Sequence, residues 1–161
     1  DKVKYNLIAR KNNINSEIKG LNCLLHLMLN KKILSDCSIV HMGSLNAHSV
    51  SHQPVFYHYL KGAIESASRA IAYKLAPLNV RSNVVIAGLV SDPSFKLNKK
   101  QIDIQKNSIP LSSGPPSITD ISNLIDFLIS NKSKSITGTS IVIDSGMSLP
   151  DSYNLLSKFI E

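Results

Sequence analysis

Long apolar runs are missing from this chain of 161 residues, although 43% of its residues are hydrophobic. A helix that crosses a membrane needs about 20 consecutive apolar residues, so no membrane partner is expected. A basic start followed by an apolar run, the mark of a secretory signal, is also missing. Charged residues make up 18% of the chain, too few for a disordered tail. The sequence predicts a cytoplasmic globular protein.

Cysteine is scarce as well, which limits disulfide and metal chemistry. Cys23 and Cys37 are too few for a disulfide framework and lack the CxxC spacing of a zinc site. His48 and His52 have the spacing of helical metal ligands, but no third ligand lies nearby in the sequence. We therefore expect no metal. Cys23 lies in a helix pattern with an apolar face and is expected to be a small buried residue.

The excess of positive charge, formally +7, is spread along the chain and consists mostly of lysine. The densest basic stretch, residues 96–106, has no interleaved aromatic residues. Proteins that bind single-stranded nucleic acid combine cations with aromatic side chains on which bases stack. No nucleic-acid partner is expected.

Helix-type and strand-type patterns alternate along the chain. Helical spacing of apolar residues starts at Ile14, a second helix is predicted from about Pro54 to Leu75, and a capping box of Ser117 and Asp120 opens another. Short apolar strands are predicted at 38–42, 80–86 and 140–143. This alternation predicts a single α/β domain over 1–161 with a parallel sheet. Residues 91–116, a polar stretch with four prolines, form a predicted long loop with one short helix.

Three residues in this frame have the spacing of a proton-transfer site. Tyr57 and Lys61 lie four residues apart on one helix face. At about 4 Å an ammonium stabilises a phenolate by roughly 4 kcal/mol, which would make the phenol a usable general acid or base. Ser44 lies 13 residues before Tyr57, at the end of an apolar strand. The carboxyl ends of parallel strands are where ligands bind in open α/β sheets.

The sequence around these residues resembles the short-chain dehydrogenase/reductase family, and in particular its 3-oxoacyl reductase-like members. Ser44 and Tyr57–Lys61 are similar to the catalytic block of that family. The similarity extends from about Ile14 to Gly146. Further matching segments are 75–77 with 80–85, 87–90, 109–111, 126–130, 137–138 and 142–146.

The resemblance implies a Rossmann-like doubly wound parallel sheet and an oxidoreductase that uses NAD or NADP to interconvert a carbonyl and an alcohol. Ser44 would hold the substrate oxygen, and Tyr57 would transfer its proton as the general acid or base. Lys61 would assist Tyr57 and bind the nicotinamide ribose, and Tyr57, Gly88 and Val90 would also contact the cofactor. Residues 91–116 would form the substrate loop. The partners implied are a small carbonyl or alcohol substrate and further copies of the chain, in a homodimer or homotetramer.

The sequence also departs from the family. Its seven glycines are too far apart to form the glycine-rich turn that binds a pyrophosphate. The chain therefore resembles the C-terminal three-fifths of a member, without the N-terminal βαβ half, and its start at Asp1 is typical of a processed product or a piece of a longer protein. Asp92 replaces a frequent threonine, and the helical asparagine of the family falls near Asn15 and Ser16. An alternative is a non-enzymatic fragment or scaffold with the same fold that cannot bind the cofactor alone.

Overall fold

A three-stranded parallel sheet forms the centre of the protein in a computed structural model. The structure describes residues 19–21, 23, 25, 26, 30, 35–91, 94 and 98–149. The strands are β1 (Ser38–Ser44), β2 (Arg81–Ala87) and β3 (Ser140–Ile143), in the spatial order β1-β2-β3. In the register of the sheet Ser44 pairs with Ala87, and Ala87 pairs with Ile143. The carboxyl ends of all three strands therefore lie level at one edge.

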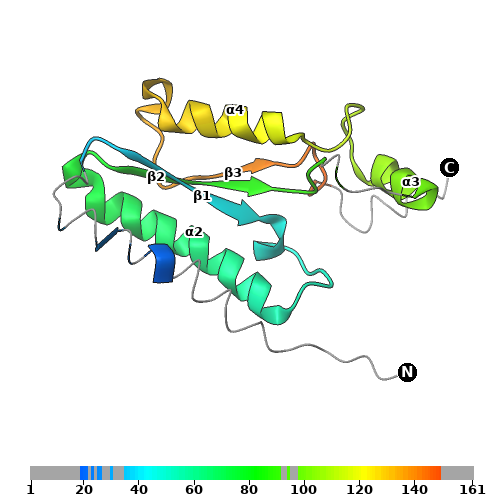
Figure 1. The fold of residues 1–161 in the computed structure, drawn as a ribbon, viewed down its shortest axis with the longest axis horizontal. Coiled ribbons are helices and arrows are strands. Elements are labelled where there is room, and N and C mark those ends of the chain that lie inside the picture. The colour runs from blue at the N-terminus through cyan, green and yellow to red at the C-terminus, as the bar shows by residue number, and fades with distance from the viewer. Residues whose placement is uncertain are drawn as a thin grey trace.

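Helices cover both faces of this sheet (Figure 1). Helix α2 (Val55–Leu75) lies on one face, and α4 (Ile118–Ile129) lies on the other. Helix α3 (Lys99–Ser108) lies beyond the carboxyl end of the strands. This arrangement is that of a doubly wound α/β sheet. None of the helices in the described part of the chain is long and apolar enough to span a membrane.

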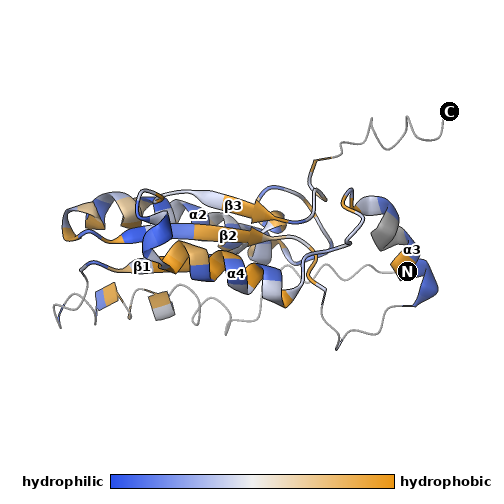
Figure 2. Cartoon of the chain, turned by 90° about the horizontal axis from the view of Figure 1, so that it is seen from above, coloured by the Kyte–Doolittle hydropathy of each residue, from blue (hydrophilic) through white to orange (hydrophobic). Residues whose placement is uncertain are grey.

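The two faces of the sheet differ in polarity. On the α4 face, Val85, Ile121 and Leu128 form an apolar core that partly buried aliphatic side chains extend. Figure 2 shows hydrophobic residues concentrated along the strands and polar residues on α3. The α2 face is more polar, because the buried stripe of that helix contains three polar residues, Lys61, Glu65 and Ser68. Buried polar groups require partners, so α2 must be bonded to the strands beneath it.

Most of the predicted elements are confirmed, with shifts at their ends. Strand β3 has the predicted bounds, and Ser117 and Asp120 form the capping box that opens α4. Strand β1 continues two residues beyond the prediction because Gly43 and Ser44 still pair with β2. Strand β2 is displaced by one residue, and Pro54 is the N-cap of α2, so the helix begins one residue after it. The short helix expected within 91–116 is α3.

The early helix is described only in part. Lys19–Leu21, Cys23, Leu25, His26 and Asn30 are helical. Cys23 is exposed, so its predicted burial is wrong. At about 100° per residue, position 23 lies on the opposite side of the helix from the partly buried Leu21 and Leu25. The start of the pattern at Ile14 and the tail from residue 150 lie outside the described residues.

Candidate functional site

Ser44 lies where β1 ends, at the carboxyl edge of the sheet. It is the N-cap of a short 3₁₀ helix, Leu45–Ala47, and its Oγ accepts a hydrogen bond of 3.2 Å from the backbone N–H of Asn46. A serine hydroxyl can accept and donate at once. This bond uses Ser44 as an acceptor, and the hydroxyl hydrogen is the group that would donate to a substrate oxygen.

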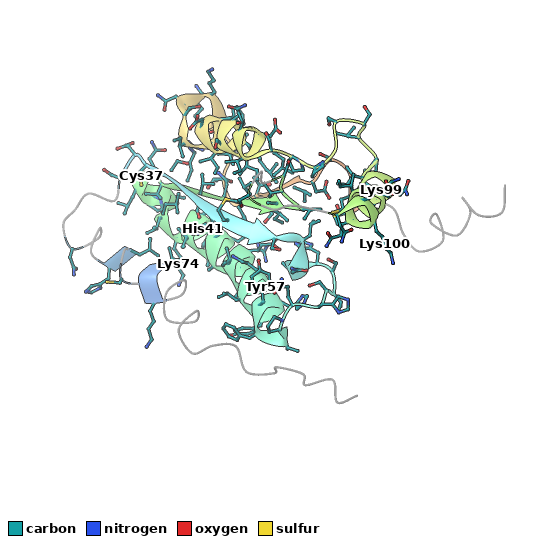
Figure 3. All side chains as sticks on the ribbon, turned by 45° about the vertical axis from the view of Figure 1, so that its right-hand side comes forward. Cys37, His41, Tyr57, Lys74, Lys99 and Lys100 are labelled. Atoms are coloured by element: carbon teal, nitrogen blue, oxygen red, sulfur yellow. The ribbon has the colours of Figure 1, made fainter. Side chains whose placement is uncertain are left out.

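Tyr57 and Lys61 lie in the first two turns of α2, one turn apart. The Lys61 Nζ lies over the Tyr57 ring, 5.6 Å from its centroid, in a cation–π contact. Lys61 is only 8% exposed, and its Nζ donates to the backbone carbonyl of Met42 at 3.3 Å. Met42 precedes Ser44 by two residues on β1. The structure thus joins α2, on which Figure 3 labels Tyr57, to β1, the strand that ends at Ser44.

Gly88 and Val90, the further cofactor residues expected from the sequence, follow β2. The Gly88 N–H donates to the Ile143 carbonyl at 3.1 Å. A Cβ at position 88 would lie 2.7 Å from the Asp144 Cβ, so only glycine allows this close approach of the two strand ends. The Val90 side chain packs against the apolar core on the α4 face. Both residues lie at the same edge of the sheet as Ser44, and each has a packing role there.

His41 and Lys61 line a small pocket on the α2 side of β1. The pocket, about 300 Å³ in volume, is also lined by Leu21, Met42 and Ile64. The His41 Nε2 lies 3.0 Å from the Ser82 Oγ, and burial lowers the pKa of this histidine. A neutral imidazole therefore accompanies the Lys61 ammonium in this pocket.

A second and larger pocket, of about 650 Å³, lies between the end of β3 and the start of α4. Its polar lining includes Ser117, Asp120 and Asp144. Burial raises the pKa of Asp144, but bonds from the N–H groups of Ser148 and Gly146 outweigh this effect and hold the pKa below its usual value. Both aspartates are bonded to neighbouring backbone amides, which indicates a structural role for them.

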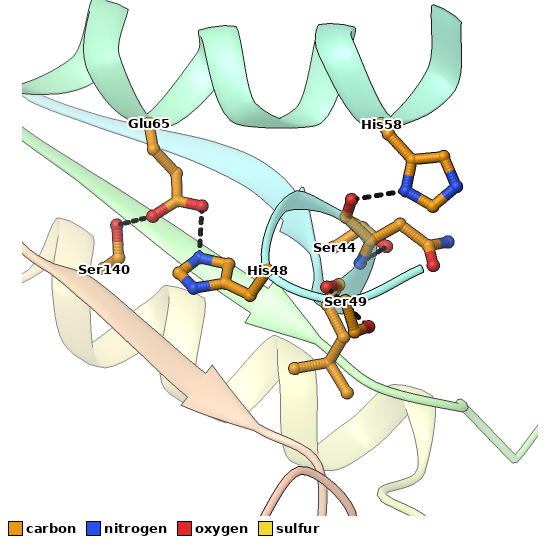
Figure 4. A network of polar contacts seen from close by, with 8 residues as sticks. Ser44, His48, Ser49, His58, Glu65 and Ser140 are labelled. Atoms are coloured by element: carbon orange, nitrogen blue, oxygen red, sulfur yellow. Dashed lines mark hydrogen bonds and ion pairs between the residues drawn. The ribbon is translucent and has the colours of Figure 1, made fainter. Parts of the chain in front are cut away.

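A set of polar contacts near Ser44 was not predicted from the sequence. The His48 Nε2 lies 2.6 Å from Glu65 Oε1, and the Ser140 Oγ donates to Glu65 Oε2 at 2.8 Å (Figure 4). The His58 Nδ1 lies 2.7 Å from the Asn46 carbonyl. One signal for Glu65 was available, because it lies four residues after Lys61 and so shares the buried face of α2.

The remaining sequence expectations concern a metal site and the roles of Asn15, Ser16 and Asp92. Within residues 19–149, as far as they are described, no group of three histidine, cysteine or acidic residues is arranged to hold a metal. Asn15, Ser16 and Asp92 lie outside the described residues, so their roles stay predictions.

Comparison with known proteins identifies the family. A family model described as enoyl-(acyl carrier protein) reductase matches residues 7–148. This chain belongs to the short-chain dehydrogenase/reductase family. A short-chain dehydrogenase/reductase of Burkholderia xenovorans has a TM-score of 0.63 and 29% identity, over 71% of this chain and 45% of that one. An oxidoreductase of Burkholderia thailandensis has a TM-score of 0.66 and 25% identity, over 77% of this chain and 50% of that one. The predicted Rossmann-like fold is thereby confirmed.

Curated members of the family match this chain at similar sequence identity and over a similar share of its length. An uncharacterized oxidoreductase of Schizosaccharomyces pombe is 32% identical over 68% of this chain, and pteridine reductase 1 of Leishmania tarentolae is 35% identical over 70%. The 3-oxoacyl-acyl-carrier-protein reductase of Rickettsia felis is 30% identical over 68%. The aligned regions make up 43%, 38% and 45% of these three proteins. The chain therefore spans less than half the length of these relatives.

Proposed function

We propose that this chain carries the catalytic residues of an NAD- or NADP-dependent oxidoreductase that interconverts a carbonyl and an alcohol. One observation carries the proposal. Lys61 is buried over the Tyr57 ring and is bonded to β1 two residues before Ser44. The phenol and the buried ammonium are thus in contact with each other, and the ammonium is bonded to the strand that ends at Ser44, at the edge of a parallel sheet where such folds bind ligands.

In this proposal Tyr57 is the proton donor for reduction. The Ser44 hydroxyl donates a hydrogen bond to the substrate carbonyl, and the Tyr57 hydroxyl gives its proton to the same oxygen. The substrate becomes an alcohol, and Tyr57 becomes a phenolate that the Lys61 ammonium stabilises. In the oxidation direction the phenolate takes the proton back. A nicotinamide, when bound, supplies or accepts the hydride that balances this proton.

The donor groups present fit the nicotinamide end of such a cofactor. Tyr57 and Lys61 lie on α2, and Gly88 and Val90 follow the carboxyl end of β2. An ammonium and a phenol are suitable partners for ribose hydroxyls. The glycines of the chain, by contrast, form no close cluster of the kind that binds a pyrophosphate. We therefore propose that groups beyond this set hold the phosphates.

The finer parts of the proposal follow from the same placement. The substrate is proposed to be a small carbonyl or alcohol compound, or a 3-oxoacyl thioester, with residues 91–116 as the loop that covers it. Such a chain is also proposed to act as a homodimer or homotetramer, since symmetric oligomers are the usual case. Exposed aromatic residues on α2, Tyr59 and Tyr73, support a contact surface there.

The second candidate function is a scaffold with the same fold but without catalysis. It is favoured by the length of the chain, less than half that of its curated relatives. The enzyme is favoured by the contact of the buried Lys61 ammonium with the Tyr57 ring, on the helix that is bonded to the strand ending at Ser44.

A matched pair of tyrosine variants tests the enzyme proposal. The protein, as its gene encodes it, is assayed for NADH- and NADPH-dependent reduction of small ketones and 3-oxoacyl thioesters. Tyr57→Phe is expected to reduce turnover at least 100-fold, within the range of general acid–base catalysis. Tyr59→Phe, on the same helix and 66% exposed, serves as the control and should retain activity. Near-normal turnover by Tyr57→Phe would remove Tyr57 from the mechanism and favour the scaffold.

A further inference from the structure

The segment that follows Ser44 is held to α2 at two points. We call residues 44–49 the Ser44 loop. The His58 Nδ1 donates to the carbonyl of Asn46 at 2.7 Å, because a carbonyl oxygen can only accept. Farther along the loop, the His48 Nε2 contacts Glu65 Oε1 at 2.6 Å. Figure 4 shows the two contacts on either side of the loop, both reaching the same helix.

The contact at Glu65 joins an accessible residue to a buried one. The Glu65 side chain is 9% exposed and that of His48 is 55% exposed. A buried carboxylate is costly unless donors satisfy its oxygens. Here the His48 N–H serves one oxygen and the Ser140 hydroxyl serves the other. Since Ser140 belongs to β3, the Glu65 carboxylate links the loop, the helix and the sheet.

The spacing of these contacts relates them to the proposed reaction. His58 follows Tyr57 directly, and Glu65 lies one helical turn after Lys61. Their partners, Asn46 and His48, lie two and four residues after Ser44. On α2, one anchor of the Ser44 loop is thus the neighbour of Tyr57, and the other lies one turn after Lys61.

We propose that His48 and Glu65 are positioning residues that fix the Ser44 loop against α2 and so set the place of the Ser44 hydroxyl relative to Tyr57. The inference rests on the proposed function for its catalytic part. Charge-assisted hydrogen bonds of this kind are short and about twice as strong as neutral ones. His48 is the better site for substitution, because its exposed ring can be removed without opening a cavity.

The first test follows the loop without any enzymatic assay. Amide hydrogen exchange is measured for residues 45–49 in the wild-type protein, as its gene encodes it, and in His48→Ala. We expect exchange in the loop to accelerate about tenfold or more, while α4 stays unchanged. His48→Gln, whose amide nitrogen can replace the Nε2–H donor, should restore much of the protection. His52→Ala, an exposed histidine farther along the connection to α2, is the control and should behave as wild type.

The second test asks whether the pair acts through Ser44. In steady-state assays His48→Ala and Glu65→Gln are expected to lower kcat about tenfold, with little change in the KM for the nicotinamide cofactor. In a Ser44→Ala background the same substitutions should have no further effect on kcat.

Each outcome decides a separate part of the inference. Unchanged loop exchange in His48→Ala would overturn the positioning role, whatever the activity. Additive losses with Ser44→Ala would show that the pair acts elsewhere and would also overturn it. If Ser44→Ala and Tyr57→Phe both retain full turnover, the proposed function fails. Faster loop exchange in His48→Ala would in that case still support the anchoring of the loop.

Discussion

Replacing Lys61 with methionine removes a charge from the candidate site and preserves most of its volume. The lysine is 8% exposed, and its stem fills space between α2 and β1 that an unbranched apolar side chain can also fill. Lys61→Met should therefore fold. It loses the hydrogen bond to the Met42 carbonyl, at a cost of about 1 kcal/mol in the free energy of unfolding.

The catalytic effect of this substitution is expected to be larger than its effect on stability. The Lys61 Nζ lies 5.6 Å from the Tyr57 ring centroid. Removing a preorganised group that stabilises a developing negative charge raises the activation barrier by about 3 kcal/mol. Because about 1.4 kcal/mol corresponds to a factor of ten in rate, turnover should fall about 100-fold.

The assay compares kcat for carbonyl reduction in Lys61→Met, Lys74→Met and the wild-type protein. Lys74 lies in the last turn of α2 and is exposed, so its substitution controls for a general loss of positive charge. Thermal denaturation checks that the melting temperature of every variant lies above the assay temperature. If Lys61→Met retained more than about a third of wild-type turnover while Tyr57→Phe lost 100-fold, the electrostatic argument would be refuted.

Three further predictions concern the isolated chain, pH and thiol reactivity. Calorimetry of the 161-residue chain with NADH or NADPH should give only millimolar or weaker affinity, because no glycine-rich turn is present to bind the pyrophosphate; micromolar binding would contradict this. Burial lowers the pKa of His41, so the unfolded state binds more protons and stability should fall as the pH drops from about 7 towards 5. In urea titrations His41→Gln should reduce this dependence, and an unchanged slope would count against it. Burial, and then the charge of Asp36, raises the pKa of Cys37, so exposed Cys23 should react faster with a thiol reagent near pH 8; equal rates would disprove this.

Local chemistry made much of the fold predictable. The capping box at Ser117 and Asp120 marks the start of α4 because each side chain satisfies a backbone N–H of the first turn. The end of β1 was placed two residues early because Gly43 resembles a turn residue. In the sheet, Gly43 instead lets the backbone approach Val84, which a Cβ would meet at 2.8 Å. Such a close approach depends on the neighbouring strand and is not visible in the local sequence.

The candidate site was predictable to the extent that helical spacing and strand ends determine it. The separation of Tyr57 and Lys61 puts both on one face of α2, and Ser44 follows a strand. The spacing could not show that Lys61 would lie over the phenol ring with a bond to β1. Nor could it show which groups would bind the Glu65 carboxylate, because its two donors come from residues 17 positions before it and 75 after it.

The polar stripe of α2 explains how the helix with the candidate catalytic residues is held in register on the sheet. Lys61 binds Met42 of β1, Ser68 contacts Ser82 of β2, and Glu65 binds Ser140 of β3. Apolar residues on this face would supply burial but would tolerate sliding of the helix, because dispersion contacts are not directional. Hydrogen bonds to all three strands have specific geometries and oppose such sliding. A shift of about 1 Å in a catalytic group can cost 100-fold in rate, so a helix that positions Tyr57 has reason to retain buried polar residues where a purely structural helix would have aliphatic ones.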